Sequence, residues 1–175
     1  MSVDRIFTVG HSTRSFEQFL ALLRGHGITQ LADIRTVPRS RRHPQFSREP
    51  LDAELAKHGV RYRHFPGLGG LRKPRPDSEN TAWRHPGFRG YADYMQTEEF
   101  DRAVRDLLAF AEGAPTAVMC AEALWWQCHR KLLADELTIR GIEVLHIASP
   151  EAAARHQVTE FGRERGGKVV YPGLT

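Results

Sequence analysis

Five side chains with reactive chemistry gather in one short stretch, directly after an apolar run that ends at Met119. Within eleven residues stand two thiols, a carboxylate, an imidazole and a guanidinium: Cys120, Glu122, Cys128, His129 and Arg130. A thiolate is a nucleophile, an imidazole exchanges protons near neutral pH, and a guanidinium binds carboxylate or phosphate. This stretch is therefore the first candidate for a functional site.

The helical pattern that follows determines how these groups would point. A helix that begins near Trp126, with 100° between residues, directs His129 towards its buried side. The first turn of a helix attracts anions, and the neighbouring Arg130 adds a donor set for phosphate or carboxylate. We interpret His129 as a general acid/base, Glu122 as its orienting group or a proton acceptor, and Arg130 as a ligand-binding residue. The alternative is that His129 donates to a carbonyl oxygen and packs.

The two cysteines are open to more than one interpretation. Close to a helix start and to cations, Cys120 would have a lowered pKa and act as a nucleophile. Both thiols would otherwise be small buried apolar groups, and for Cys128 we favour that role. The pair lacks the short Cys-x2-Cys spacing of structural zinc sites, so no metal ligand is assigned, and a metal site built from Cys and His stays an alternative. A disulfide is not expected in a reducing compartment.

Strand-like and helix-like segments alternate along the chain, as in an α/β protein. Strands are expected at residues 5–9, 30–35, 60–65, 116–120 and 143–147, with a short one near 168–171. Ser15, Ser47 and Thr97 are expected to cap helices, and further helices are expected around 91–95, from Trp126 to Arg140 and from about Pro150. This order predicts a mostly parallel sheet of about five strands with helices on both faces. The length suits one domain, residues 1–175.

Polar residues stand at the ends of several predicted strands. His11 and Ser12 follow the first strand, Asp33 and Arg35 close the second, and His146 lies near the end of the fifth. Ligands of such sheets bind at the carboxyl edge of the strands. We therefore expect the first four of these residues to bind a ligand and to converge with Glu122 and His129 in one pocket. A purely structural ion pair between Asp33 and Arg35 is the alternative.

The basic residues are concentrated in one part of the chain. Residues 35–75 carry eleven Lys and Arg against three acids, although the net charge of the whole chain is only +4. Such a segment attracts phosphates or nucleic acid, or forms a solvated surface. A nucleic-acid-binding module would use this segment with its aromatic residues Phe46, Tyr62 and Phe65. Residues 66–90 show no helical or strand period, and we interpret them as a long Pro/Gly-rich loop that forms a lid.

The motifs together resemble those of the domain-of-unknown-function 488 family of bacteria and archaea. The stretches that carry the resemblance are "TVGHS" at 8–12, "DIRTVPRS" at 33–40, "GLGG" at 67–70, "YADYM" at 91–95, "CAEALWWQCHR" at 120–130 and "VLHI" at 144–147. The resemblance implies a compact α/β domain whose motif residues include those selected above. It implies no activity.

The sequence thus favours a small enzyme with a polar pocket at the carboxyl edge of the sheet. The pocket would bind an anionic, phosphate-bearing compound and use acid/base or thiol chemistry; nucleic-acid binding and metal binding are the alternatives. No apolar run reaches the roughly 18 residues of a membrane span, and the N-terminus does not read as a secretory signal, so we expect a cytoplasmic protein without a membrane partner. Cofactors and oligomeric state are not identified.

Overall fold

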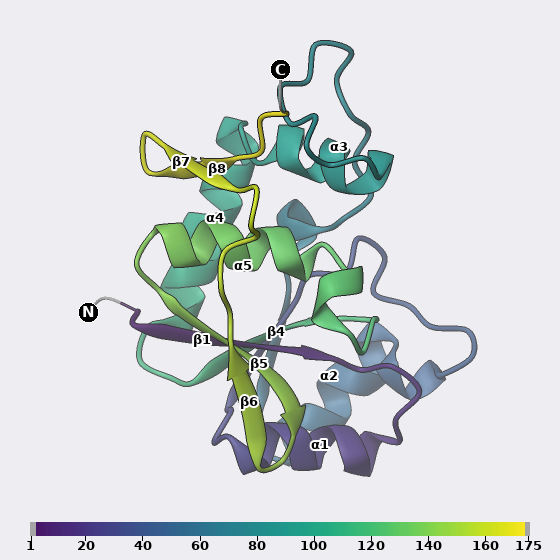
Figure 1. The fold of residues 1–175 in the computed structure, drawn as a ribbon. Helices are drawn as coiled ribbons and strands as arrows, with labels where there is room; N and C mark the ends of the chain where they lie inside the picture. Colours follow the sequence, from purple (N-terminus) through teal and green to yellow (C-terminus); the bar gives the residue numbers. More distant parts are fainter. Residues whose placement is uncertain (1–2, 174–175) are drawn as a thin grey trace.

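The computed structural model of the protein describes residues 3–173, and its centre is a six-stranded sheet (Figure 1). The strand order is β3-β2-β4-β1-β5-β6; the first five run parallel and β6 pairs antiparallel with β5. The strands are β1 (Arg5–Gly10), β2 (Gln30–Asp33), β3 (Arg61–His64), β4 (Thr116–Cys120), β5 (Glu143–Ser149) and β6 (Ala152–Arg155). A separate hairpin joins β7 (Arg163–Arg165) to β8 (Lys168–Val170).

Helices cover both faces of the sheet, so the predicted single α/β domain is confirmed. On one face α1 (Phe16–Gly25) and α2 (Arg48–Lys57) bury Phe19, Leu23, Leu51 and Leu55 against alternate residues of β1, β2 and β4. On the other face lie α3 (Pro86–Tyr94), α4 (Glu98–Ala111) and α5 (Arg130–Ile139). Because successive residues of a strand point to opposite faces, each strand supplies side chains to both cores.

Local sequence signals account for most helix starts. Ser15 caps α1 in a capping box with Gln18, and Thr97 accepts from the backbone N–H of Phe100 at the start of α4, as predicted. Helix α2 follows Ser47, although the Ser47 side chain makes no capping hydrogen bond. Short 3₁₀ turns occupy Pro44–Phe46, Pro66–Leu68 and Trp125–Gln127.

Three predicted elements were placed wrongly. Helix α5 begins at Arg130 and not near Trp126, because a 3₁₀ turn over Trp125–Gln127 and an extended Cys128 precede it. Helix α3 begins at Pro86, inside the segment 66–90 that we expected to lack structure. The alanine-rich segment after Pro150 forms β6 instead of a helix, because pairing with the open edge of β5 satisfies its backbone.

The chain changes face at β4, and this places a crevice there. The connections that leave β1 and β2 run to α1 and α2 on one face, whereas the connection that leaves β4 runs to α5 on the other. Strand β4 lies between β1 and β2. At its carboxyl end, Cys120, the connections of both neighbouring strands therefore leave towards the opposite face of the sheet. Such a reversal is where open α/β sheets form their binding crevices.

None of the helices in the described part of the chain combines the length and the apolar character that crossing a membrane requires.

Candidate functional site

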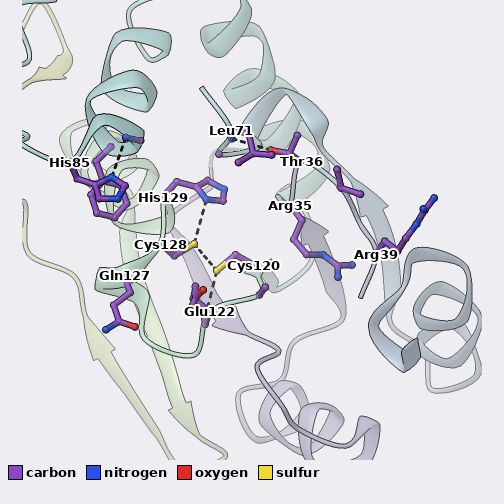
Figure 2. Close-up of a pocket in the computed structure, with 15 residues that line it drawn as sticks. Arg35, Thr36, Arg39, Leu71, His85, Cys120, Glu122, Gln127, Cys128 and His129 are labelled. Carbon is purple, nitrogen blue, oxygen red and sulfur yellow. Dashed lines mark hydrogen bonds between the residues drawn. The ribbon is translucent and has the colours of Figure 1, made fainter. Parts of the chain in front are cut away.

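Two adjoining cavities open at the carboxyl edge of the sheet, beside the end of β4. The first, which we call the thiol pocket, has a volume of about 430 Å³ and is lined by residues from segments 35–39, 70–71, 85–88, 120–122 and 127–129 (Figure 2). The second cavity, of about 500 Å³, is lined by segments 11–13, 40–43 and 121–124 and by Gln127. Both cavities share Ala121, Glu122 and Gln127, so they lie on either side of this turn.

The two thiols lie in contact at the floor of the thiol pocket. Cys120 ends β4, Cys128 is an extended residue two positions before the start of α5, and their sulfur atoms are 2.7 Å apart. Both cysteines are free and buried, with exposed fractions of 2% and 6%. The S–H group of Cys128 donates to the sulfur of Cys120, and the S–H group of Cys120 faces the carbonyl oxygen of Glu122 at 3.7 Å. The buried role that we favoured for Cys128 is therefore incomplete, because its sulfur is held in a polar network.

His129 forms the other side of this network, and its tautomer follows from its partners. Its Nε2 lies 2.9 Å from the carbonyl oxygen of Ile34, which accepts only, so Nε2 carries the hydrogen. The free Nδ1 then faces the sulfur of Cys128 at 3.4 Å. A backbone carbonyl thus orients an imidazole so that its unprotonated nitrogen is directed at a thiol, in a nucleophile–base–orienting group arrangement.

The surroundings favour ionisation of Cys128 and disfavour that of Cys120. Burial raises the pKa of the Cys128 thiol, but the interactions with Cys120 and His129 and the charge of Arg130 favour the thiolate, outweigh burial and hold this pKa well below its ordinary value. The backbone N–H of Arg130 adds a further donor at 3.4 Å. For Cys120, burial and its interaction with Cys128 raise the pKa. Cys128, not Cys120, is therefore the better placed thiolate.

Arg130 does not face either cavity, which corrects its assignment as a ligand-binding residue. Its side chain is 1% exposed and donates to the Thr8 hydroxyl and to the carbonyl oxygens of Glu122 and Ala123, at 3.2, 2.7 and 3.2 Å. These partners carry no formal charge. Arg130 therefore holds the turn after β4 in place, and its positive charge acts on the nearby sulfur atoms from the buried side.

Asp33 and Arg35 form a buried ion pair, as the structural alternative for them predicted. Both carboxylate oxygens of Asp33 accept from the guanidinium of Arg35, at 2.9 and 2.7 Å, and the Tyr62 hydroxyl also donates to Asp33. Asp33 is fully buried and lines neither cavity, whereas Arg35 reaches the wall of the thiol pocket. Asp33 therefore acts through Arg35, whose remaining N–H group lies 3.4 Å from Nε2 of His11.

His11 and Ser12 lie in the turn after β1 and line the second cavity. Nδ1 of His11 lies 2.9 Å from the carbonyl oxygen of Ser12, and its ring stacks on Phe46. Ser12 adopts a left-handed backbone with φ of 51°, unusual for a residue with a side chain. The N–H groups of both residues donate to the carbonyl oxygens of Cys120 and Ala121, so this turn is fastened to the end of β4.

The structure brings Glu122 to the mouth of both cavities but not to His129. Both ring nitrogens of His129 already face other atoms, namely Ile34 and Cys128. Glu122 is exposed, and its backbone carbonyl receives Arg130. A Cβ atom on Gly10 would meet that carbonyl oxygen at 1.7 Å, so only glycine permits this approach. The orienting role predicted for Glu122 belongs instead to the Ile34 carbonyl.

Comparison with known proteins identifies the family of this fold and site. The family model described as "Domain of unknown function DUF488" matches residues 15–137, well over half of the chain. The chain belongs to the DUF488 family. No match was found among curated proteins or among solved structures. The matched region of this DUF488 protein includes Arg35, both cysteines and His129, whereas His11 and Ser12 precede it.

Several residues of the thiol pocket were missed by sequence reasoning. His85 accepts from the backbone N–H of Gly87 through Nδ1, which leaves an Nε2–H donor at the exposed wall. Gly70 packs against the imidazole of His129, where a Cβ atom would lie 2.6 Å from Nδ1. The sequence signals were the His-Pro start of α3 and the "GLGG" turn, and both lie in the segment that we interpreted only as a lid.

A buried polar chain supports Arg130 from beneath the site. Asp135 accepts from His156, whose other ring nitrogen accepts from His146 at 2.8 Å, and His146 in turn accepts from Thr8 at 2.6 Å. The Thr8 hydroxyl then accepts from Arg130. His146 lies in β5, where it is paired with Thr8 of β1, and it is below the carboxyl edge of the sheet rather than at it. His146 therefore acts on the pocket only indirectly, through Thr8 and Arg130.

The geometry gives no support to a metal site. In the part of the chain that the structure describes, no three or more His, Cys, Asp or Glu side chains gather in a way that would hold a metal ion. The thiols and His129 are instead paired with each other and with Ile34. The metal-dependent alternative is not carried further.

Mild acidification should destabilise the protein through two buried imidazoles. Burial, the largest cause in both, lowers the pKa of His11 to about 4 and that of His146 to about 3, from an ordinary 6.5. Below pH 6.5 the two imidazoles bind protons in the unfolded chain but not in the folded protein, so stability falls as the pH falls. The free energy of unfolding should drop by up to ~1.4 kcal/mol per pH unit for each imidazole.

Urea unfolding at pH 7, 6 and 5 measures this drop. The His11→Gln/His146→Gln double variant should show a flatter pH dependence, even if it is less stable at pH 7. Equal stability of the unmodified protein at pH 7 and pH 5 would contradict the expectation.

Proposed function

We propose that this DUF488 protein is a thiol-dependent enzyme in which Cys128 is the nucleophile and His129 its base. The observation that carries the proposal is the convergence of three groups on one sulfur atom at the floor of a cavity. The thiol of Cys120, Nδ1 of His129 and the backbone N–H of Arg130 lie 2.7, 3.4 and 3.4 Å from the sulfur of Cys128. A buried thiol with no chemical role requires none of these partners.

The proposed first step is proton transfer from Cys128 to His129. Nδ1 of His129 is free to take the proton, and the Ile34 carbonyl holds the ring in place through Nε2. The resulting thiolate is stabilised by the N–H of Arg130 and by the guanidinium of Arg130 below it. His129 keeps the general acid/base role assigned from the sequence, while the nucleophile moves from Cys120 to Cys128.

The walls of the thiol pocket favour an anionic compound. Arg39 is exposed on one wall, and His85 presents an Nε2–H group on another. Glu122 lies at the mouth, where it would accept a proton from a bound compound. Segment 66–90 supplies Gly70, Leu71 and the start of α3 to the wall, consistent with the covering role expected for it.

The alkylation of Cys128 by iodoacetamide tests the proposal. We expect Cys128 to be modified at pH 7 as fast as a fully ionised thiol. The rate should fall only on strong acidification, because the thiolate persists down to the lowered pKa of Cys128. The modified residue is identified by peptide mapping. Anionic compounds that bind the thiol pocket should slow the reaction. An unreactive Cys128 at pH 7 and pH 9 would reject the proposed nucleophile.

Nucleic-acid binding is a second candidate, favoured by the rim of the two cavities. The exposed arginines Arg39, Arg41 and Arg42 lie on it, and so do the exposed apolar side chains of Val37, Leu71 and Leu124. The aromatic residues expected for this role are not available, because Phe46 and Phe65 are buried and Tyr62 is bonded to Asp33. Exposed apolar groups beside cations are suited to bases and phosphates of a single strand.

Charge reversal of the rim arginines measures this second function. Replacing Arg39, Arg41 and Arg42 by glutamate should weaken binding of a labelled single-stranded oligonucleotide at least ~100-fold and flatten its dependence on salt. The control reverses three exposed arginines remote from the cavities, namely Arg24, Arg102 and Arg163. A specific nucleic-acid interface would be ruled out if the two triple variants lost equal affinity for the oligonucleotide. It would also be ruled out if the unmodified protein did not bind the oligonucleotide.

A further inference from the structure

The two thiols differ in a way that a single nucleophile does not require. The sulfur of Cys128 contacts the thiol of Cys120, Nδ1 of His129 and the backbone N–H of Arg130, whereas the sulfur of Cys120 faces Cys128 and, at 3.7 Å, the carbonyl oxygen of Glu122. Figure 2 shows Cys128 between His129 on one side and Cys120 on the other. One thiol is thus arranged to attack a ligand, and the other is arranged to attack the first.

We propose that Cys120 is a resolving thiol and that the thiol pocket carries out thiol–disulfide exchange on a small anionic disulfide. This inference rests on the proposed function, because Cys128 must first act as the nucleophile. It adds the reaction class, the substrate class and the role of the second cysteine.

The positions of the two sulfur atoms permit a disulfide with little movement. They lie 2.7 Å apart, and a disulfide bond requires about 2.05 Å, so an approach of less than ~1 Å is enough. The backbone on both sides is already held: the carbonyl of Cys120 accepts from His11, and the carbonyl of Cys128 accepts from Lys131. We therefore expect the change to be confined to the two side chains.

The reaction balances in two exchange steps. In the first, the Cys128 thiolate attacks one sulfur of R–S–S–R; the S–S bond breaks, a mixed disulfide forms on Cys128, and the leaving thiolate takes the proton that His129 received. In the second, Cys120 loses its proton and attacks the sulfur of Cys128; the second R–S group leaves and takes that proton. The substrate gains two electrons and becomes two thiols, and the protein becomes a Cys120–Cys128 disulfide. Two molecules of a low-mass thiol then reduce the protein.

The substrate class follows from the cavity. The thiol pocket, at about 430 Å³, admits a low-mass compound, and both cysteines are too deeply buried to meet a disulfide in a folded protein. Arg39 and the Nε2–H of His85 lie on its walls and are suited to carboxylates. A carboxylate-bearing disulfide therefore fits better than a neutral one.

The experiment treats the reduced full-length protein with glutathione disulfide and follows thiol release and protein mass. The unmodified protein should release two thiols and map to a Cys120–Cys128 disulfide with no bound glutathione. Cys120→Ser should release one thiol and retain glutathione on Cys128, with release of the second slowed at least ~100-fold. The Cys120→Ala variant is tested in the same way. The disulfide map of the unmodified protein tests the resolving role without any variant. Neutral bis(2-hydroxyethyl) disulfide should react more slowly than glutathione disulfide.

The outcomes separate this inference from the proposed function. A stable mixed disulfide on Cys128 in the unmodified protein, with Cys120 still open to alkylation after unfolding, overturns the resolving role and leaves Cys128 as a nucleophile. Faster reaction with the neutral disulfide overturns the substrate class. No reaction of Cys128 with either disulfide or with iodoacetamide overturns the nucleophile itself.

Discussion

The His129→Gln variant should lose most of the reactivity of Cys128 at neutral pH. Glutamine can still donate to the Ile34 carbonyl through its amide, but it has no basic nitrogen to accept the thiol proton. Without the imidazole, the pKa of Cys128 returns towards that of an ordinary thiol, about 8.5, at which only about 3% is ionised at pH 7. Alkylation by iodoacetamide at pH 7 should therefore slow by roughly 10–30-fold.

The pH profile distinguishes this effect from structural damage. In the unmodified protein the rate is constant above the lowered pKa of Cys128 and falls as the pH drops through it. In His129→Gln the midpoint should move upward, so that the two proteins react at similar rates near pH 9. The control is His58→Gln, at an exposed residue that caps the end of α2. A variant that reacts slowly at every pH, or a midpoint that does not move, would contradict the role of His129.

The Arg130→Met variant should lose about 3–5 kcal/mol of stability, the largest loss that we expect from one substitution, because three acceptors lose their donor. Methionine fills much of the volume but donates nothing, so the Thr8 hydroxyl and the carbonyl oxygens of Glu122 and Ala123 lose their donor while remaining buried or half-buried. Each unsatisfied group costs about 1–3 kcal/mol. Arg130→Lys should rescue little, because one ammonium group cannot reach three acceptors in a fork.

Urea unfolding followed by circular dichroism measures this loss as a lower midpoint with an unchanged slope. Arg102→Met, at an exposed position of α4, serves as the control and should change stability by less than about 0.5 kcal/mol. Arg130→Met should also raise the pKa of Cys128, because Arg130 is one of the charges that lower it. A variant as stable as the control would show that the buried guanidinium is dispensable.

Both expectations depend on contacts that join distant parts of the chain. His129 is fixed by the carbonyl of Ile34, and Arg130 is fixed by Thr8 from β1. The buried chain through His146, His156 and Asp135 holds Thr8 from the opposite side. Substitutions well outside the cavity should therefore damage the site, and Asp135 is the first position at which we expect this effect.

The framework of the fold and the edge at which the site lies follow from the amino-acid sequence alone. Alternating apolar strands and amphipathic helices require a covered, largely parallel sheet, since each apolar face must be buried. The carboxyl ends of parallel strands meet at one edge, so His11, Arg35 and Cys120 were expected near each other from their places after three strands. Their positions follow from the pattern of the backbone and need no knowledge of side-chain contacts.

The roles of these groups depend instead on contacts between distant parts of the chain. Arg130 was expected to bind a ligand, but the depth of its burial against Thr8 makes it a support. Cys128 was expected to be inert, but the turn after Cys120 folds back and sets the two sulfur atoms together beside His129. The β6 segment has helical composition and pairs with β5 instead. In each case the deciding interaction joins residues through space, and local sequence preferences are too weak to specify it.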